Sequence, residues 1–179
     1  INPGANVGRA VYHSGTIGAA LTGRNGGISG VAVSQAVQGY GVEGQGWDEM
    51  LIGQKWDTAA AVASAFVEGL VRDLPREPVV VNINVPNVEI DEIAGWRHAT
   101  VGTDLQRRLS SAQLVPKEGH PGAFNVKMSW GEAVSLPAHT DGGMVEQGEV
   151  AISYLSRLSH TERDDMAAGE ASLAAFLQR

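Results

Sequence analysis

The order of apolar and polar positions predicts a chain in which a helix lies between two buried strands. Apolar residues recur every four positions from Asp57 to Leu74, the spacing of one helix face, and Asp57 or Thr58 is suited to cap it. Segments 31–33 and 79–85 are short, β-branched and nearly continuously apolar, as strands buried on both faces are. Strand, helix and strand in this order form a βαβ unit with parallel strands. The pattern therefore predicts an α/β fold with helices flanking the sheet.

Weaker patterns predict the remaining elements. Segment 124–130 alternates apolar and polar residues, which is typical of a half-exposed strand or a hairpin arm, and such an arm often serves dimer contact. The other predicted elements are a helix over 14–24, strands over 96–101 and 150–155, and a last helix over 161–179 capped by Thr161 with Asp164 three residues on.

In two stretches the apolar residues recur with no clear period. Residues 35–54 are rich in glycine and predict a long loop, in which Tyr40 and Trp47 either pack the loop down or form an apolar wall. Residues 102–122 mix charges, serine and proline.

Composition narrows the function classes. The chain has 179 residues, enough for one domain with a core, and a net charge of −7, which argues against binding to polymeric nucleic acid. The absence of cysteine excludes disulfides, zinc–thiolate sites and thiol nucleophiles and fits a cytoplasmic protein. The sequence has no apolar run near the ~20 residues that span a bilayer, so we expect no membrane partner.

The first sixteen residues carry the strongest candidate chemistry. They read I-N-P-G-A-N-V-G-R-A-V-Y-H-S-G-T, with Asn2 and Asn6 in a glycine-rich loop. An Asn side-chain oxygen is a hard ligand suited to Mg²⁺ or Mn²⁺. Ser14, Gly15 and Thr16 open the predicted helix, where free N–H groups, the helix dipole and hydroxyls favour phosphate. The alternative is an ordinary Ser or Thr cap without a ligand.

Other polar residues give weaker signals. The five histidines (His13, His98, His120, His139 and His160) are far apart and show no metal-binding spacing, although His13 adjoins Ser14 and could contact phosphate. Thr140 and Asp141 favour a helix cap over a ligand role, and Asp164 with Asp165 fits an acidic first turn.

Four ordered motifs resemble the SurE family of metal-dependent 5′/3′-nucleotidases. The loop I-N-P-G-A-N-V-G with H-S-G-T-I resembles the family's S-G-I-N-x-G-x-N-x-G and Y-S-G-T-V, with His13 in place of Tyr. The strand G-V-A-V-S, the segment N-I-N-V-P at 82–86, and H-T-D followed by G-E-V-A-I-S resemble its later motifs. The likeness spans most of the chain up to about Leu155 and fades beyond it.

The resemblance implies a three-layer αβα, Rossmann-like fold with a mostly parallel sheet, a phosphatase domain over 1–155 and a helical tail over 156–179. It implies hydrolysis of nucleoside 5′- and 3′-monophosphates with Mg²⁺ or Mn²⁺ in a homodimer or homotetramer. Carried over residue by residue, Asn2 would be a metal ligand, Asn6 would lie beside metal and phosphate, and Ser14, Gly15 and Thr16 would bind the phosphate.

Two departures from the family pattern are the basis for an alternative to the nucleotidase hypothesis. The family's N-terminal N-D-D-G, whose aspartates hold the metal, and a further Ser ligand are not found, and the chain begins inside a motif. We therefore expect an N-terminally truncated chain that binds metal weakly and hydrolyses little substrate, unless Asp48 or Asp141 takes the place of the missing metal-binding aspartates. The alternative function is a non-catalytic fragment or phosphate-binding remnant.

Overall fold

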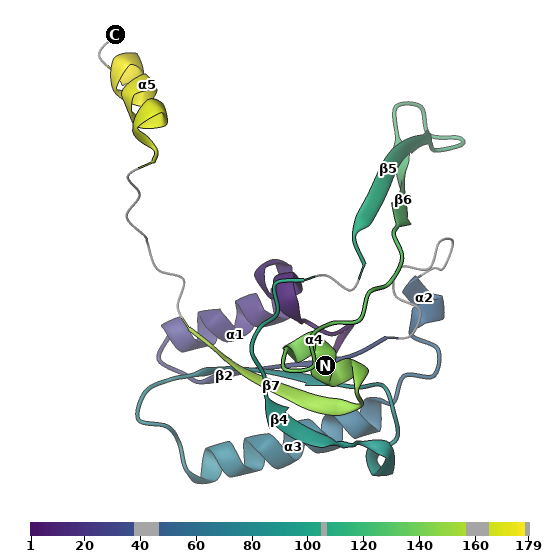
Figure 1. Ribbon diagram of the computed structural model, residues 1–179, viewed down its shortest axis with the longest axis vertical. Helices are drawn as coiled ribbons and strands as arrows, with labels where there is room; N and C mark the ends of the chain where they lie inside the picture. Colours follow the sequence, from purple (N-terminus) through teal and green to yellow (C-terminus); the bar gives the residue numbers. More distant parts are fainter. Residues whose placement is uncertain (38–46, 105–106, 157–164, 178–179) are drawn as a thin grey trace.

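The computed structural model describes residues 1–37, 47–104, 107–156 and 165–177. In this part of the chain, a five-stranded sheet has the order β1-β2-β3-β7-β4. Figure 1 labels its strands β2, β7 and β4. Its strands are β1 (Asn2–Pro3), β2 (Gly30–Gln35), β3 (Val80–Val85), β7 (Glu149–Leu155) and β4 (Gly95–His98). The described helices are η1 (Gly8–His13), α1 (Gly15–Asn25), α2 (Trp47–Met50), α3 (Trp56–Arg72), η2 (Ile90–Glu92), α4 (Asp141–Glu146) and α5 (Ala167–Leu177).

The predicted βαβ unit is confirmed as β2, α3 and β3, with the two strands parallel. The predicted cap is wrong, because α3 begins at Trp56 with Lys55 at the N-cap and without a side-chain capping bond. Contacts from elsewhere in the fold set this boundary. The Lys55 N–H donates to Asn87 Oδ1 at 2.8 Å, and the Lys55 carbonyl accepts from Gln35 Nε2 at 2.7 Å.

The sheet is mixed and mostly parallel, as expected. The β1–β2, β2–β3 and β4–β7 pairs are parallel, whereas β7 runs antiparallel to β3. The strand predicted over 96–101 extends too far at its C-terminal end. The observed strand β4 ends at His98, and Thr100 makes a separate bridge to Thr140. The chain thus leaves the sheet after His98, which brings the segment after β4 beside the start of α4.

Helices cover both faces of the sheet, which gives the three-layer architecture. Residues alternate across β3, so Val81 and Ile83 pack toward α3, where Ala59 completes a core cluster. On the opposite face, Val80 packs with Ile17 and other residues of α1. α4 also packs against β7 and β3. The two apolar clusters therefore lie on opposite faces of one sheet.

The alternating segment 124–130 is confirmed as one arm of a hairpin, β6 (Phe124–Trp130), which pairs antiparallel with β5 (Leu109–Pro116). Figure 1 shows the hairpin projecting away from the sheet. Strand β5 was not predicted, because all of its residues are exposed and burial therefore imposes no alternation on its sequence. The hairpin exposes Leu114, Phe124 and Val126 by more than half of their surface.

The C-terminal helix predicted over 161–179 is present as α5, but it begins only at Ala167. Asp165 and Met166 are described and lie outside the helix, so the acidic first turn predicted for Asp164 with Asp165 is wrong. Every described residue from 165 to 177 is exposed. The predicted Thr161 and Asp164 capping pair lies outside the described residues, and the division at residue 155 stays a prediction.

The segment predicted as a loop over 35–54 contains α2, a single helical turn, and Tyr40 lies outside the described part. Among the described helices, none is long and apolar enough to cross a membrane.

Candidate functional site

The candidate site begins where the parallel strands β1 and β2 end. Asn2 on β1 is in register with Ser34 on β2, and the Gly4 N–H continues the pairing by donating to the Gln35 carbonyl at 2.7 Å. Ligands in open α/β sheets commonly bind beyond the carboxyl ends of such strands. The glycine-rich loop after β1 therefore lies at the edge of the sheet that suits a ligand.

Asn6 anchors this loop in a buried polar network. Its N–H donates to Asn84 Oδ1 at 2.7 Å, and its side-chain Nδ2 donates to Ser34 Oγ at 2.7 Å. Its carbonyl accepts from Asn82 Nδ2 at 2.9 Å and from Asn84 Nδ2 at 3.2 Å. Ser34, Asn82 and Asn84 are fully buried. Side chains of β2 and β3 thus fix both the main chain and the side chain of Asn6.

The next fixed point along the loop is Gly8, the first residue of η1. The Gly8 N–H donates to Asp141 Oδ2 at 2.9 Å. Gly8 has φ of 53°, and a Cβ there would lie 2.9 Å from the carbonyl oxygen of Asp104. A larger residue would be strained and would clash with main chain. Glycine is therefore the residue that fits this turn without strain.

The helix start predicted at Ser14 is confirmed. Ser14 is the N-cap of α1, an 11-residue helix, and its Oγ accepts from the Ile17 N–H at 3.2 Å. Thr16 is half-buried, while Gly15 is exposed and a Cβ built on it meets no atom within 4 Å. The first N–H groups of a helix lack intrahelical acceptors. The start of α1 is thus open to an anion.

Thr140 caps α4, as predicted, because its Oγ1 accepts from the Gly143 N–H at 3.2 Å. Asp141 is 1% exposed and accepts the N–H groups of Gly8, Gly102 and Gly142 at 2.9, 3.0 and 2.9 Å. A cavity of about 180 Å³ adjoins this carboxylate, and His139 is among the residues that line it.

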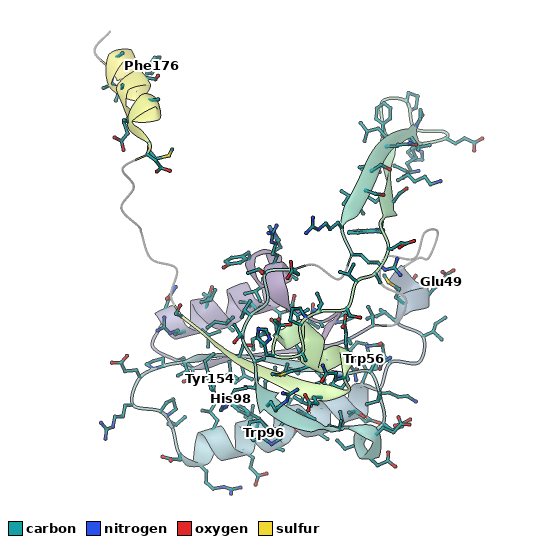
Figure 2. All side chains as sticks on the ribbon, viewed as in Figure 1. Glu49, Trp56, Trp96, His98, Tyr154 and Phe176 are labelled. Atoms are coloured by element: carbon teal, nitrogen blue, oxygen red, sulfur yellow. The ribbon has the colours of Figure 1, made fainter. Side chains whose placement is uncertain are left out.

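The other histidines that the structure describes show no common site, and His160 lies outside the described residues. His13 is exposed at the end of η1, beside Ser14. His98 lies on β4 between Trp96 and Tyr154, with ring centroids 5.6 and 5.4 Å apart (Figure 2). Among the described residues, no three His, Asp or Glu side chains form a group that could hold a metal ion.

Asn2 can offer a single ligand to a divalent cation. Its Nδ2 donates to the carbonyls of Pro3 at 3.1 Å and Gly4 at 2.7 Å, which leaves Oδ1 as the coordinating atom. Mg²⁺ is usually bound through one or two carboxylates, and Asp141 already uses both oxygens on main-chain N–H groups. The residues described here therefore do not by themselves fit a divalent cation.

Sequence reasoning missed the supporting residues Ser34, Asn82 and Asn84. One signal was available, because Asn82 and Asn84 interrupt an otherwise apolar buried strand. Buried polar side chains need hydrogen-bond partners, so polar residues at alternating positions of such a strand indicate that a polar loop packs on that face.

Comparisons with known proteins agree with the motifs. A family model described as "Survival protein SurE" matches residues 1–108. The 5′/3′-nucleotidase SurE of Erwinia tasmaniensis is 33% identical over 159 residues, which cover 87% of this chain and 54% of that protein. The 5′/3′-nucleotidase SurE of Salmonella arizonae is 31% identical over 170 residues, covering 92% and 58%.

A solved structure extends the likeness to the fold. The crystal structure of the SurE protein from Aquifex aeolicus matches with a TM-score of 0.62 at 21% identity, over 100% of this chain and 63% of that one. The chain thus spans little more than half the length of the curated relatives it matches.

Proposed function

Because the chain belongs to the SurE family, we propose that it is a phosphatase-type hydrolase that acts on nucleoside 5′- and 3′-monophosphates. The observation that carries the proposal is the start of α1, where Ser14 caps the helix and Gly15 is exposed. This helix start follows a loop whose position β2 and β3 fix through Asn6. A helix N-terminus with free N–H groups is a site for phosphate.

In this proposal, the N–H groups of Gly15 and Thr16 and the hydroxyls of Ser14 and Thr16 bind the phosphate oxygens. Open space above Gly15 lets a phosphate approach the main chain. Asn6 contributes mainly by holding the loop, because its N–H, carbonyl and Nδ2 are all engaged within the protein. The positive end of the helix dipole adds to the attraction.

Asn2 Oδ1 is our candidate for one ligand of a divalent cation. Since this oxygen is neutral and no three His, Asp or Glu side chains of the described residues form a group that could hold a metal ion, we expect weak binding of Mg²⁺ or Mn²⁺ by this chain. The same observation favours the second candidate function, a phosphate-binding protein without turnover.

We further propose a homo-oligomer in which the β5–β6 hairpin contacts a second copy. An isolated two-stranded hairpin is at best marginally stable in water, and this one exposes large apolar side chains such as Leu114 and Phe124. Burial against a partner copy would stabilise it. Sedimentation velocity of Phe124→Ser against the unaltered chain tests this proposal, and an unchanged mass would contradict it.

The test of function measures binding of adenosine 5′-monophosphate (AMP) and phosphate release with Mn²⁺. Ser14→Ala is compared with Thr22→Ala, a matched hydroxyl removal further along α1, where Thr22 Oγ1 donates only to the Gly18 carbonyl. We expect Ser14→Ala alone to weaken AMP binding. Turnover by the unaltered chain supports the hydrolase, and binding without turnover supports the second candidate. No binding of AMP would contradict both.

A further inference from the structure

Asp141 joins three segments of the chain that are far apart in the sequence. Its Oδ2 accepts the N–H of Gly8, and its Oδ1 accepts the N–H groups of Gly102 and Gly142. Gly8 lies 133 positions from Asp141, and Gly102 lies 39 positions from it. One carboxylate therefore ties the loop after β1 and the segment after β4 to the start of α4.

A cap for α4 does not explain these bonds. Thr140 already caps the helix by accepting from the Gly143 N–H, so Asp141 is not required for that purpose. The carboxylate is buried, and none of the ion pairs between described residues includes it. Burying a charge is costly unless it is well hydrogen-bonded. Its two oxygens are satisfied by main-chain donors, which is the arrangement of a group that fixes backbone.

The hydrogen bond between Gly8 and Asp141 lies at the point where the loop after β1 turns into η1. Asn6 is fixed from β2 and β3, and Ser14 begins α1. Between them, η1 starts at Gly8, whose positive φ and close approach to the Asp104 carbonyl leave little room for adjustment. The Asp141 carboxylate is the anchor at the start of η1, so it determines how η1 presents Ser14 and the residues after it.

We propose that Asp141 is a positioning residue for the phosphate site, acting through Gly8 and η1. The inference rests on the proposed function of the Ser14–Thr16 segment as the phosphate site. A carboxylate can accept from donors at both oxygens, whereas the amide of Asn can accept at only one. Asp141→Asn therefore keeps the size of the side chain but sets an NH₂ group against one of the N–H donors.

The first readout is the affinity for AMP of Asp141→Asn, measured by calorimetry well below its unfolding temperature. Val81→Ala is the matched control, because Val81 is fully buried against α3 on the opposite face of the sheet and its truncation lowers stability away from the loop. We expect Asp141→Asn to weaken binding about tenfold (1.4 kcal/mol per factor of ten) and Val81→Ala to leave it within about twofold. Equal effects of the two variants would overturn the proposal.

The second readout does not need a ligand and separates this inference from the proposed function. In amide NMR spectra, Asp141→Asn is expected to shift the resonances of Gly8, Gly15 and Thr16, whereas Val81→Ala leaves them in place. Unshifted Gly15 and Thr16 resonances would overturn the proposal even if AMP binds. If AMP binds no variant but the shifts occur, the positioning role holds and the proposed function fails.

Gly8→Ala is the replacement test variant if Asp141→Asn does not fold. It keeps the carboxylate but alters the same turn through the positive φ and the clash with the Asp104 carbonyl. We expect the same loss of AMP affinity and the same shifts at Gly15 and Thr16, and unchanged values for both would again overturn the proposal.

Discussion

Replacing Asn84 by Ala tests whether the polar network under the loop stabilises the fold. The substitution removes the acceptor of the Asn6 N–H, a bond of 2.7 Å, in a position with no exposed surface. The Asn6 carbonyl keeps its bond from Asn82 at 2.9 Å, so the N–H alone loses its partner. An unsatisfied buried donor costs about 1–3 kcal/mol, and the cavity left by the side chain adds about 1 kcal/mol. We expect a loss of about 2–4 kcal/mol in the free energy of unfolding.

Urea unfolding followed by circular dichroism measures this loss. With a slope of about 2 kcal/mol per molar urea, the midpoint should fall by roughly 1–2 M. Asn25→Ala, at the exposed end of α1, is the control and should change the free energy by less than about 0.5 kcal/mol. Asn84→Asp keeps the volume but places an oxygen near the Asn6 carbonyl, so it should destabilise at least as much. Equal midpoints for Asn84→Ala and Asn25→Ala would refute the reasoning.

Three further predictions concern other parts of the chain. Gly30→Ala should lower the free energy of unfolding by about 1–3 kcal/mol in thermal melts, because its Cβ would lie 2.4 Å from the Ala20 carbonyl oxygen and push α1 off β2; an unchanged melting temperature would contradict the close packing. The hydrogen bond from Lys55 to Glu89, with their charge attraction, raises the pKa of Lys55 above its ordinary 10.5. From neutral pH up to about 10.5 the contribution of this pair is therefore fully present, and it is lost as pH rises through the folded pKa. The stability difference between the unaltered chain and Glu89→Gln should therefore persist at pH 8 and shrink at high pH, where only the effect on the η2 cap of Glu89 is left. Phe176→Ser should change the free energy of unfolding by less than about 0.5 kcal/mol in dilute solution, because the side chain is 66% exposed; a larger loss would mean that α5 packs against the fold.

The parts of the fold that the sequence predicts well are those where burial imposes a pattern. β2, α3 and β3 are buried on a regular face, so β-branched runs and the four-residue spacing identify them. β5 was missed because both of its faces are exposed. The start of α3 was displaced because Gln35 and Asn87, which contact Lys55, come from elsewhere in the fold. Local sequence does not contain such contacts.

The sequence predicts the loop of the candidate site but not the side chains from other elements that hold this loop in place. Glycines, asparagines and a Ser cap indicate that residues 1–16 could bind a metal ion or a phosphate. The partners of Asn6 come from strands 28 and 78 positions away. The three donors of Asp141 could not be inferred from the Thr140–Asp141 pair, which looks like an ordinary helix start.

The position of β7 in the sheet has a consequence for synthesis of the chain on the ribosome. Among the described strands, β4 has only β7 as its sheet neighbour, and β7 ends at Leu155, 57 positions after His98. At about 5–20 residues per second, translation of that interval takes roughly 3–11 s. During this time the nascent chain holds a completed β2–α3–β3 unit in which the edge of β3 is open, while β4 has no strand to join. That edge is a template for pairing with another chain, so co-translational aggregation should depend on how fast codons 99–155 are read.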